Sequence, residues 1–209
     1  GCKAIYITNN ASRAASRVAA MLQDIGLNAA EADVLTSAQA ALGLAEDVLE
    51  PGDPVLVLGA QPFKDLVRDA GYQVTDSADD APKAVLHGHN PDTGWAELSE
   101  AALAIRAGAV YLASNMDTTL PMERGLMVGN GSMIAAVTSA TGVTPRSAGK
   151  PEPAMFHQAA ERSGAKSPLG IGDRLDTDLA GGVAAGMPTL HVLTGVSGQV
   201  PAGQALALV

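Results

Sequence analysis

The stretch Gly170–Asp178 constrains the fold of this chain more than any other segment. It reads Gly-Ile-Gly-Asp-Arg-Leu-Asp-Thr-Asp, and the small residues of Leu179–Gly186 that follow it predict a helix. An acidic cluster on a loop between a strand and a helix is typical of open parallel sheets, which place their chemistry at the carboxyl ends of strands. The sequence therefore predicts an α/β fold built on a Rossmann-like parallel sheet.

Two roles are open for the carboxylates of this cluster, Asp173, Asp176 and Asp178. Hard oxygen ligands suit Mg²⁺, which proteins usually hold with one or two carboxylates and substrate phosphate oxygens. Alternatively, the same residues cap the helix that follows, because Asp is favoured in the first turn of a helix. These residues alone leave both roles open.

A second polar segment lies near the start of the chain. The apolar run Ala4–Ile7 predicts a buried parallel strand, and it ends in Thr8, Asn9 and Asn10. Ser12 is then expected to cap a helix over residues 13–26. A hydroxyl, an amide and backbone N–H donors at a strand end are suited to a phosphoryl oxygen, although an ordinary Asx turn has the same composition.

A lysine in a constrained setting is the third candidate. Lys150 follows Gly149, precedes Pro151 and stands at the head of a predicted helix, Ala154–Ser163. A compact ammonium held there is a suitable point charge for a phosphate, whereas most loop lysines are only solvated.

Taken in order, Tyr6–Arg13, Gly149–Phe156 and Gly170–Asp178 resemble motifs II, III and IV of the haloacid dehalogenase (HAD) superfamily of phosphatases. The resemblance is to the NagD and p-nitrophenyl phosphatase-like branch, which has a large cap inserted between motifs II and III. It covers nearly the whole chain, including Leu193–Ser197, and the segment from Thr93 to Ser132 looks most like glycerol-3-phosphate phosphatases.

The resemblance implies a domain organisation and a reaction. Residues 1–50 and 145–209 would form a parallel-sheet core, and residues 51–144 an inserted α/β cap. The expected reaction is Mg²⁺-dependent hydrolysis of small phosphate monoesters through an aspartyl-phosphate intermediate.

The resemblance also implies roles for individual residues. Asp173 would bind Mg²⁺, and Asp178 would support the water shell of the metal. Lys150 would offset charge on the nucleophile and the phosphoryl oxygens. Thr8, supported by Asn9 and Asn10, would bind a nonbridging oxygen of the phosphate.

One motif of the family is absent. The only Asp-x-Asp in the chain is Asp176–Asp178, and Asn115–Thr119 mimics the nucleophile loop with Asn in place of the attacking carboxylate. Because the missing strand would be central in the sheet, its loss would leave backbone groups of both neighbours unpaired. We therefore expect the natural protein to extend upstream of Gly1, by on the order of 30–40 residues judged from the resemblance, and we expect these 209 residues alone to be inactive and poorly folded.

Composition narrows the partners. The net charge of −9 argues against binding to nucleic acid or to an anionic membrane surface. The chain has no run of 18 apolar residues that would predict a membrane span. The single cysteine, Cys2, fits a reducing cytoplasm. The expected partner is a small phosphorylated metabolite, and a homodimer formed through the cap is left open.

Three other functional classes share some of these sequence features. They are a phosphate-ester binding protein without turnover, a nicotinamide-dependent oxidoreductase, disfavoured because no G-x-G-x-x-G occurs, and a response-regulator-like domain, disfavoured by the large insertion. Among substrates, Leu120 stands before Pro121 where relatives selective for pyridoxal phosphate carry a His. We therefore expect glycerol 3-phosphate first and phosphoglycolate second, ahead of pyridoxal phosphate and sugar phosphates.

Overall fold

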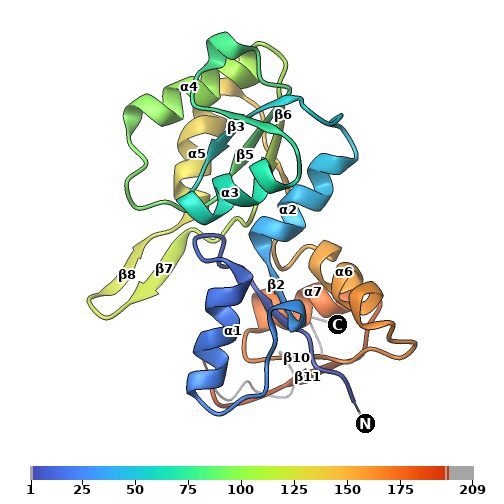
Figure 1. Ribbon diagram of the computed structural model, residues 1–209. Helices are drawn as coiled ribbons and strands as arrows, with labels where there is room; N and C mark the ends of the chain where they lie inside the picture. The colour runs from blue at the N-terminus through green and yellow to red at the C-terminus, as the bar shows by residue number, and fades with distance from the viewer. Residues whose placement is uncertain (1, 196, 198–209) are drawn as a thin grey trace.

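The computed structural model describes residues 2–195 and 197, which form an upper and a lower half (Figure 1). The lower half contains β1 (Tyr6–Thr8), α1 (Ala15–Asp24), a 3-10 turn (Glu31–Asp33), β2 (Val34–Thr36), α6 (Ala154–Ser163), β10 (Gly170–Gly172), a π-helical turn (Leu175–Leu179), α7 (Ala180–Ala184) and β11 (Thr189–His191). The upper half contains α2 (Ser37–Glu46), β3 (Pro54–Leu58), α3 (Gln61–Asp69), β4 (Gln73–Thr75), a 3-10 turn (Ala78–Asp80), β5 (Ala84–His87), α4 (Trp95–Arg106), β6 (Val110–Ala113), β7 (Thr119–Met122), β8 (Gly125–Val128), α5 (Asn130–Thr141) and β9 (Arg146–Ser147).

The upper half is a three-layer α/β sandwich around a parallel sheet. Its five strands lie in the order β4-β3-β5-β6-β9, and every pairing between neighbours is parallel. Strand β3 is apolar on both faces: Val55 and Val57 pack into one hydrophobic cluster with Phe63 of α3, while Leu56 and Leu58 pack into a second cluster on the opposite face. A strand covered on both sides by helices needs apolar residues at every position, which explains the uninterrupted run of β3.

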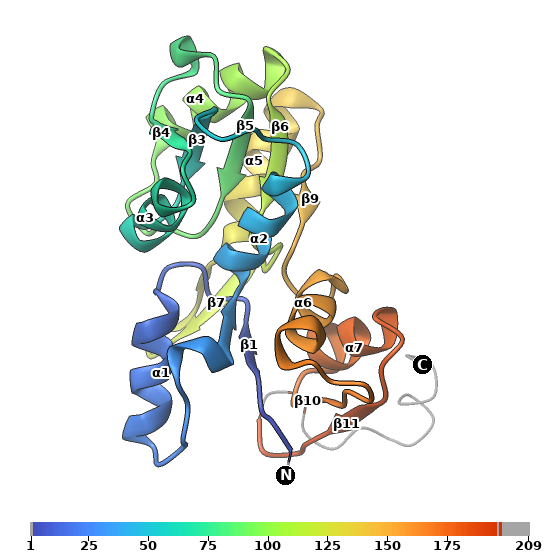
Figure 2. The ribbon, with the colours of Figure 1, turned by 45° about the vertical axis from the view of Figure 1, so that its right-hand side comes forward.

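Helix α2 joins the two halves (Figure 2). It begins after Thr36, whose hydroxyl accepts the N–H of Gln39, and the Gln39 side chain accepts the N–H of Thr36 in return. Ala38 and Ala41 of this helix belong to the same hydrophobic cluster as Val55 and Val57 of the upper sheet. The core is therefore continuous across α2.

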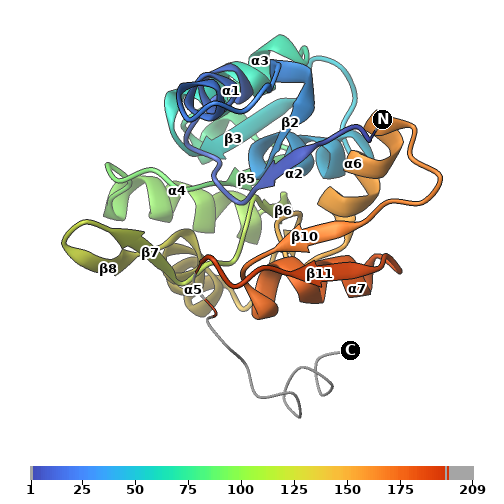
Figure 3. The same ribbon diagram turned by 90° about the horizontal axis from the view of Figure 1, so that it is seen from below.

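The parallel strands of the lower half form two separate pairs. β1 pairs with β2, and β10 pairs with β11, both in parallel. Within residues 2–195 and 197, no strand connects β1 to β10, so each of these strands has one unpaired edge. Seen from below, the β1–β2 pair lies towards the top of the view and the β10–β11 pair lies below it (Figure 3).

Three local expectations differ from the structure. Helix α1 begins at Ala15 and has no side-chain cap, because Ser12 donates its N–H and its hydroxyl to Oδ1 of Asn10. The sequence predicts a turn at Gly129–Ser132 before a helix over Met133–Thr141, whereas helix α5 begins three residues earlier, at Asn130. The antiparallel hairpin of β7 and β8 was not expected.

We expect the buried His87 to make the folded protein less stable in mild acid. Its ring is 1 % exposed and contacts the Tyr111 hydroxyl at 2.8 Å, and burial lowers its pKa from 6.5 to about 4. The unfolded chain therefore binds a proton that the folded chain does not, so this contribution to stability is complete above pH 6.5 and is lost as the pH falls towards 4. Urea unfolding should show a loss of about 3 kcal/mol over this range.

The matched comparison for that measurement is His87→Gln, which removes the titrating ring and leaves every other acid group in place. The variant should lose stability less steeply between pH 6.5 and 4 than the parent. Equal pH dependence of the two proteins would contradict the assignment.

No helix in the described part of the chain is both long enough and apolar enough to cross a membrane.

Candidate active site

Three polar segments that lie far apart in the sequence meet in the lower half. Thr8–Asn10 end β1, Lys150 lies shortly before α6, and the acidic cluster follows β10. The hydrogen bonds described below connect all three, and they define the candidate site.

The centre of the site is an ion pair between Lys150 and Asp178. Lys150 Nζ donates to Asp178 Oδ1 at 2.6 Å, and each of the two side chains is only 13 % exposed. Because both side chains are largely shielded from water, salt screens the attraction between the two charges only weakly.

Asp178 also organises the loop that follows β10. Its second oxygen, Oδ2, accepts the N–H of Asp173 at 3.2 Å and that of Arg174 at 3.1 Å. Gly172 lies against it, since a Cβ atom at this glycine would stand 2.2 Å from the Cβ of Asp178. Three donors and a glycine thus fix this carboxylate in one place.

Asp173 is held by the end of β11 and the segment that follows it. Its carbonyl accepts the N–H of Ser197 at 3.2 Å and lies 3.3 Å from Nε2 of His191. A Cβ atom at Gly195 would stand 1.9 Å from Oδ2 of Asp173, so only glycine fits there. The segment Leu193–Ser197, part of the motif resemblance, thus packs against the predicted metal ligand; Val196 lies outside the described residues.

The carboxylates fit part of a divalent-cation site. Asp173 offers a hard oxygen donor beside Asp178, yet nowhere in residues 2–195 and 197 do three His, Cys, Asp or Glu side chains gather to hold a metal. Mg²⁺ usually keeps several waters and takes one or two carboxylates together with substrate phosphate. The residues present match that incomplete shell rather than an all-protein cage.

The Thr8–Asn10 loop is tied to Lys150 mainly by Asn9. Asn9 Oδ1 accepts the N–H of Lys150 at 2.8 Å, and its Nδ2 donates to the carbonyl of Lys150 at 3.0 Å and to Oδ2 of Asp117 at 3.1 Å. Asn10 uses its side-chain oxygen to accept from Ser12. The Thr8 hydroxyl accepts the N–H of Asn10 at 3.2 Å, which leaves its own proton to donate.

Asp176 differs from Asp173 and Asp178 because its carboxylate pairs with Arg174. The guanidinium donates from Nε and Nη2 to the two carboxylate oxygens at 3.1 and 2.8 Å. This hydrogen bonding lowers the pKa of Asp176 and raises the pKa of Arg174. Of the three carboxylates in the cluster, Asp176 is therefore bound to a cation of its own loop.

Sequence reasoning missed three residues that lie against the loop after β1. The Asn115 amide donates to the carbonyl of Asn9 at 2.8 Å, the Ser37 hydroxyl donates to the same carbonyl at 2.6 Å, and Asp117 accepts from the Asn9 amide. The signal was present, because Asn115 and Asp117 follow the buried strand β6 just as Asn9 and Asn10 follow β1.

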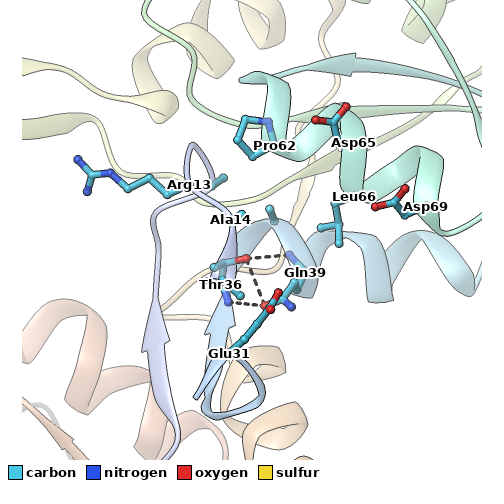
Figure 4. Close-up of a pocket in the computed structure, with 12 residues that line it drawn as sticks. Arg13, Ala14, Glu31, Thr36, Gln39, Pro62, Asp65, Leu66 and Asp69 are labelled. Carbon is cyan, nitrogen blue, oxygen red and sulfur yellow. Dashed lines mark hydrogen bonds between the residues drawn. The ribbon is translucent and has the colours of Figure 1, made fainter. Parts of the chain in front are cut away.

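A cavity of about 290 Å³ lies elsewhere, between the start of α1, the start of α2 and helix α3 (Figure 4). Arg13, Glu31 and Asp65 are among its lining residues, and Thr8, Lys150, Asp173 and Asp178 are not. Polar side chains fixed by hydrogen bonds, rather than the shape of this cavity, identify the site.

The fold and site together define an α/β protein with a lysine and paired carboxylates after the ends of parallel strands. The chain belongs to the haloacid dehalogenase-like hydrolase family: residues 1–73 match the family described by that name, and residues 147–206 match the family described as HAD-hydrolase-like. The resemblance seen in the motifs is thereby confirmed.

Two relatives make the family assignment firm. D-glycerol 3-phosphate phosphatase from Mycobacterium tuberculosis is 50 % identical over 92 % of this chain and 55 % of its own length. Acid sugar phosphatase from Staphylococcus aureus is 35 % identical over 94 % of this chain and 76 % of its own length. The chain thus spans little more than half of the first relative.

Solved structures agree with the fold. The glycerol phosphate phosphatase from Mycobacterium tuberculosis, solved in complex with magnesium, superposes with a TM-score of 0.89 at 50 % identity and covers 93 % of this chain and 59 % of its own. The p-nitrophenyl phosphatase from Archaeoglobus fulgidus superposes with a TM-score of 0.88 at 29 % identity, covering 98 % and 78 %. The expected α/β fold class and the expected p-nitrophenyl phosphatase-like branch are confirmed.

Proposed function

We propose that the protein is a Mg²⁺-dependent phosphatase of small phosphate monoesters, with glycerol 3-phosphate as its first substrate. The observation that carries the proposal is the shielded Lys150–Asp178 pair, 2.6 Å long, held beside Asp173 and joined through Asn9 to the loop of Thr8. It combines a fixed cation, a hard oxygen donor and a hydroxyl donor, which are the groups that stabilise charge on a transferring phosphoryl group.

The loop after β1 would hold the phosphate. The Thr8 hydroxyl would donate a hydrogen bond to a nonbridging oxygen, and Asn9 and Asn10 would support substrate binding. Their side-chain hydrogen bonds keep the loop in one conformation, which leaves Thr8 in place when the substrate arrives.

The charged residues would neutralise the developing charge. Lys150 would offset charge on the nucleophile and the phosphoryl oxygens, while Asp178 holds its ammonium in place and would support the water shell of the cation. Asp173 would be the carboxylate ligand of the metal, which when bound would supply positive charge to the phosphate oxygens. The chain contains no Asp-x-Asp-Gly, so the attacking carboxylate of an aspartyl-phosphate route is assigned to none of these 209 residues.

The test of the function is phosphate release from p-nitrophenyl phosphate and glycerol 3-phosphate by the intact protein with Mg²⁺. A phosphate-ester binding protein without turnover is the second candidate, because the chain has no recognisable nucleophile. That candidate would bind glycerol 3-phosphate in calorimetry while releasing no phosphate.

We expect the substrate order glycerol 3-phosphate, then phosphoglycolate, then pyridoxal phosphate. Leu120 offers no imidazole to stack on a pyridoxal ring, and the 50 % identical relative is named for glycerol 3-phosphate. The measurement is kcat/KM across a panel that includes sugar phosphates. A tenfold higher kcat/KM for pyridoxal phosphate than for glycerol 3-phosphate would contradict the expectation. That ratio corresponds to a difference of about 1.4 kcal/mol in transition-state binding.

The wider organisation follows the same proposal. Residues 1–50 and 145–209 would act as the core and residues 51–144 as the inserted cap, with α2 and β9 where the halves meet. A homodimer through the cap and a cytoplasmic location stay predictions.

A further inference from the structure

Asp117 brings a carboxylate from the upper half to the candidate active site. It lies on the segment between β6 and β7, and its Oδ2 accepts the Asn9 amide at 3.1 Å, across 108 positions of sequence. The same Asn9 side chain binds the backbone of Lys150 twice: its Nδ2 donates to the Lys150 carbonyl, and its Oδ1 accepts the Lys150 N–H. Asn9 therefore links Asp117 to Lys150 through hydrogen bonds, and Thr8 is the residue before Asn9 in the chain.

The start of α5 holds this segment rigidly. The N–H groups of Gly129 and Gly131 donate to the carbonyls of Thr118 and Asp117 at 2.9 and 2.8 Å. A Cβ atom at Gly131 would stand 2.2 Å from the carbonyl oxygen of Met116, so the close approach requires glycine.

Buried side chains add to this support. The Asn130 amide, 2 % exposed, donates to the carbonyl of Asn115 at 2.8 Å. Asn115 in turn accepts the N–H of Asp117 at 3.1 Å. These contacts fix the backbone that carries Asp117, so its carboxylate is preorganised for one position.

The second carboxylate oxygen of Asp117, Oδ1, is able to accept a further hydrogen bond. Within residues 2–195 and 197, Oδ1 of Asp117 accepts no hydrogen bond, and the side chain is partly exposed. The Asn9 side chain contacts both Asp117 and Lys150, so this oxygen lies next to the hydrogen-bonded network of the site.

We propose that Asp117 determines substrate specificity, by accepting a hydrogen bond from a hydroxyl group on the leaving group of the phosphate ester. This inference rests on the proposed phosphatase function. An ionised carboxylate accepts hydrogen bonds and donates none, so it favours a polyol, whose hydroxyls donate, and disfavours a leaving group that is itself a carboxylate. A site built to hydrogen-bond a substrate hydroxyl discriminates strongly against analogues that lack it.

The alternative is a purely structural role, in which the Asn9–Asp117 contact only holds the two halves together. Such a role affects all substrates alike, because it alters the loop of Thr8 and Lys150 whatever the leaving group. The two roles therefore differ in the ratio of activities between substrates.

The experiment compares Asp117→Asn with the parent in the intact protein with Mg²⁺, using glycerol 3-phosphate, phosphoglycolate and p-nitrophenyl phosphate. The exposed Asp92→Asn of the same half is the matched control. Because a charged acceptor becomes a neutral one, kcat/KM for glycerol 3-phosphate should fall at least about tenfold. The value for p-nitrophenyl phosphate should stay within about threefold, and the value for phosphoglycolate should rise as a like charge is removed.

Parallel losses on all three substrates, or no loss on glycerol 3-phosphate, would overturn the inference and leave the phosphatase function standing. If the parent protein turns over none of them, the proposed function fails, and binding still tests Asp117. Calorimetry should then show weaker binding of glycerol 3-phosphate to Asp117→Asn with unchanged binding of inorganic phosphate. Equal changes for both ligands would overturn the inference.

Discussion

The Asp173→Asn variant of the intact protein is expected to lose at least about 100-fold in kcat on p-nitrophenyl phosphate with Mg²⁺. The amide keeps the shape of the side chain and the packing against Gly195, but it removes the negative charge that the metal requires. Titration calorimetry with Mg²⁺ alone should show the same loss as weaker binding, which separates a metal effect from a general loss of activity.

Asp24→Asn is the control for this measurement. Asp24 is an exposed carboxylate at the end of α1, so its substitution should change neither Mg²⁺ binding nor kcat. Adding a chelator to the parent should reproduce the Asp173→Asn phenotype. Near-normal activity of Asp173→Asn in the presence of chelator would remove the metal assignment.

Lys150→Met is expected to reduce both activity and stability. Activity should fall by about 100-fold or more because the ammonium beside the phosphate is lost. The free energy of unfolding should fall by about 3 kcal/mol, because Asp178 keeps its charge in a shielded position without its cation. The 13 % exposure of both side chains is the reason to expect more than the effect of a surface ion pair.

Lys64→Met provides the surface comparison. Lys64 pairs with Asp76 at 2.5 Å, but Asp76 is 77 % exposed, and such pairs contribute about 0–1 kcal/mol. Adding Asp178→Asn to Lys150→Met should recover part of the lost stability and none of the activity, because the unpaired charge disappears while the site stays incomplete. Equal effects of Lys150→Met and Lys64→Met on stability would show that the shielded pair has no special energetic role.

Local sequence patterns were sufficient for most helices and strands. The apolar run Pro54–Leu58, ended by Gly59, predicts a strand and is one in the structure, and the helix predicted over Ala154–Ser163 has those bounds. Both signals are local, since apolar periodicity, Pro and Gly act within a few residues. The same local reasoning failed for Ser12, because Asn10, two residues away, takes both of its donors.

Motif order was sufficient for the family and for the candidate residues, but it could not assign partners among them. Asp176 and Asp178 stand two positions apart with the same chemistry, yet one binds Arg174 in its own loop and the other binds Lys150, 28 positions away. The roles predicted for Thr8, Lys150, Asp173 and Asp178, and the division into core and cap, stay predictions.

Sequence patterns therefore determined the parallel α/β class, the order of the motifs and the short list of polar residues at strand ends. Tertiary packing alone decided that Asn9 joins Lys150 to Asp117, and that a segment resembling an incomplete nucleophile loop supplies a carboxylate to the site. The physical reason is the distance along the sequence over which each kind of interaction acts. Helix and strand formation depends on neighbours within a turn or a strand, whereas a hydrogen bond across 108 positions forms only after the packed core has brought its two ends together.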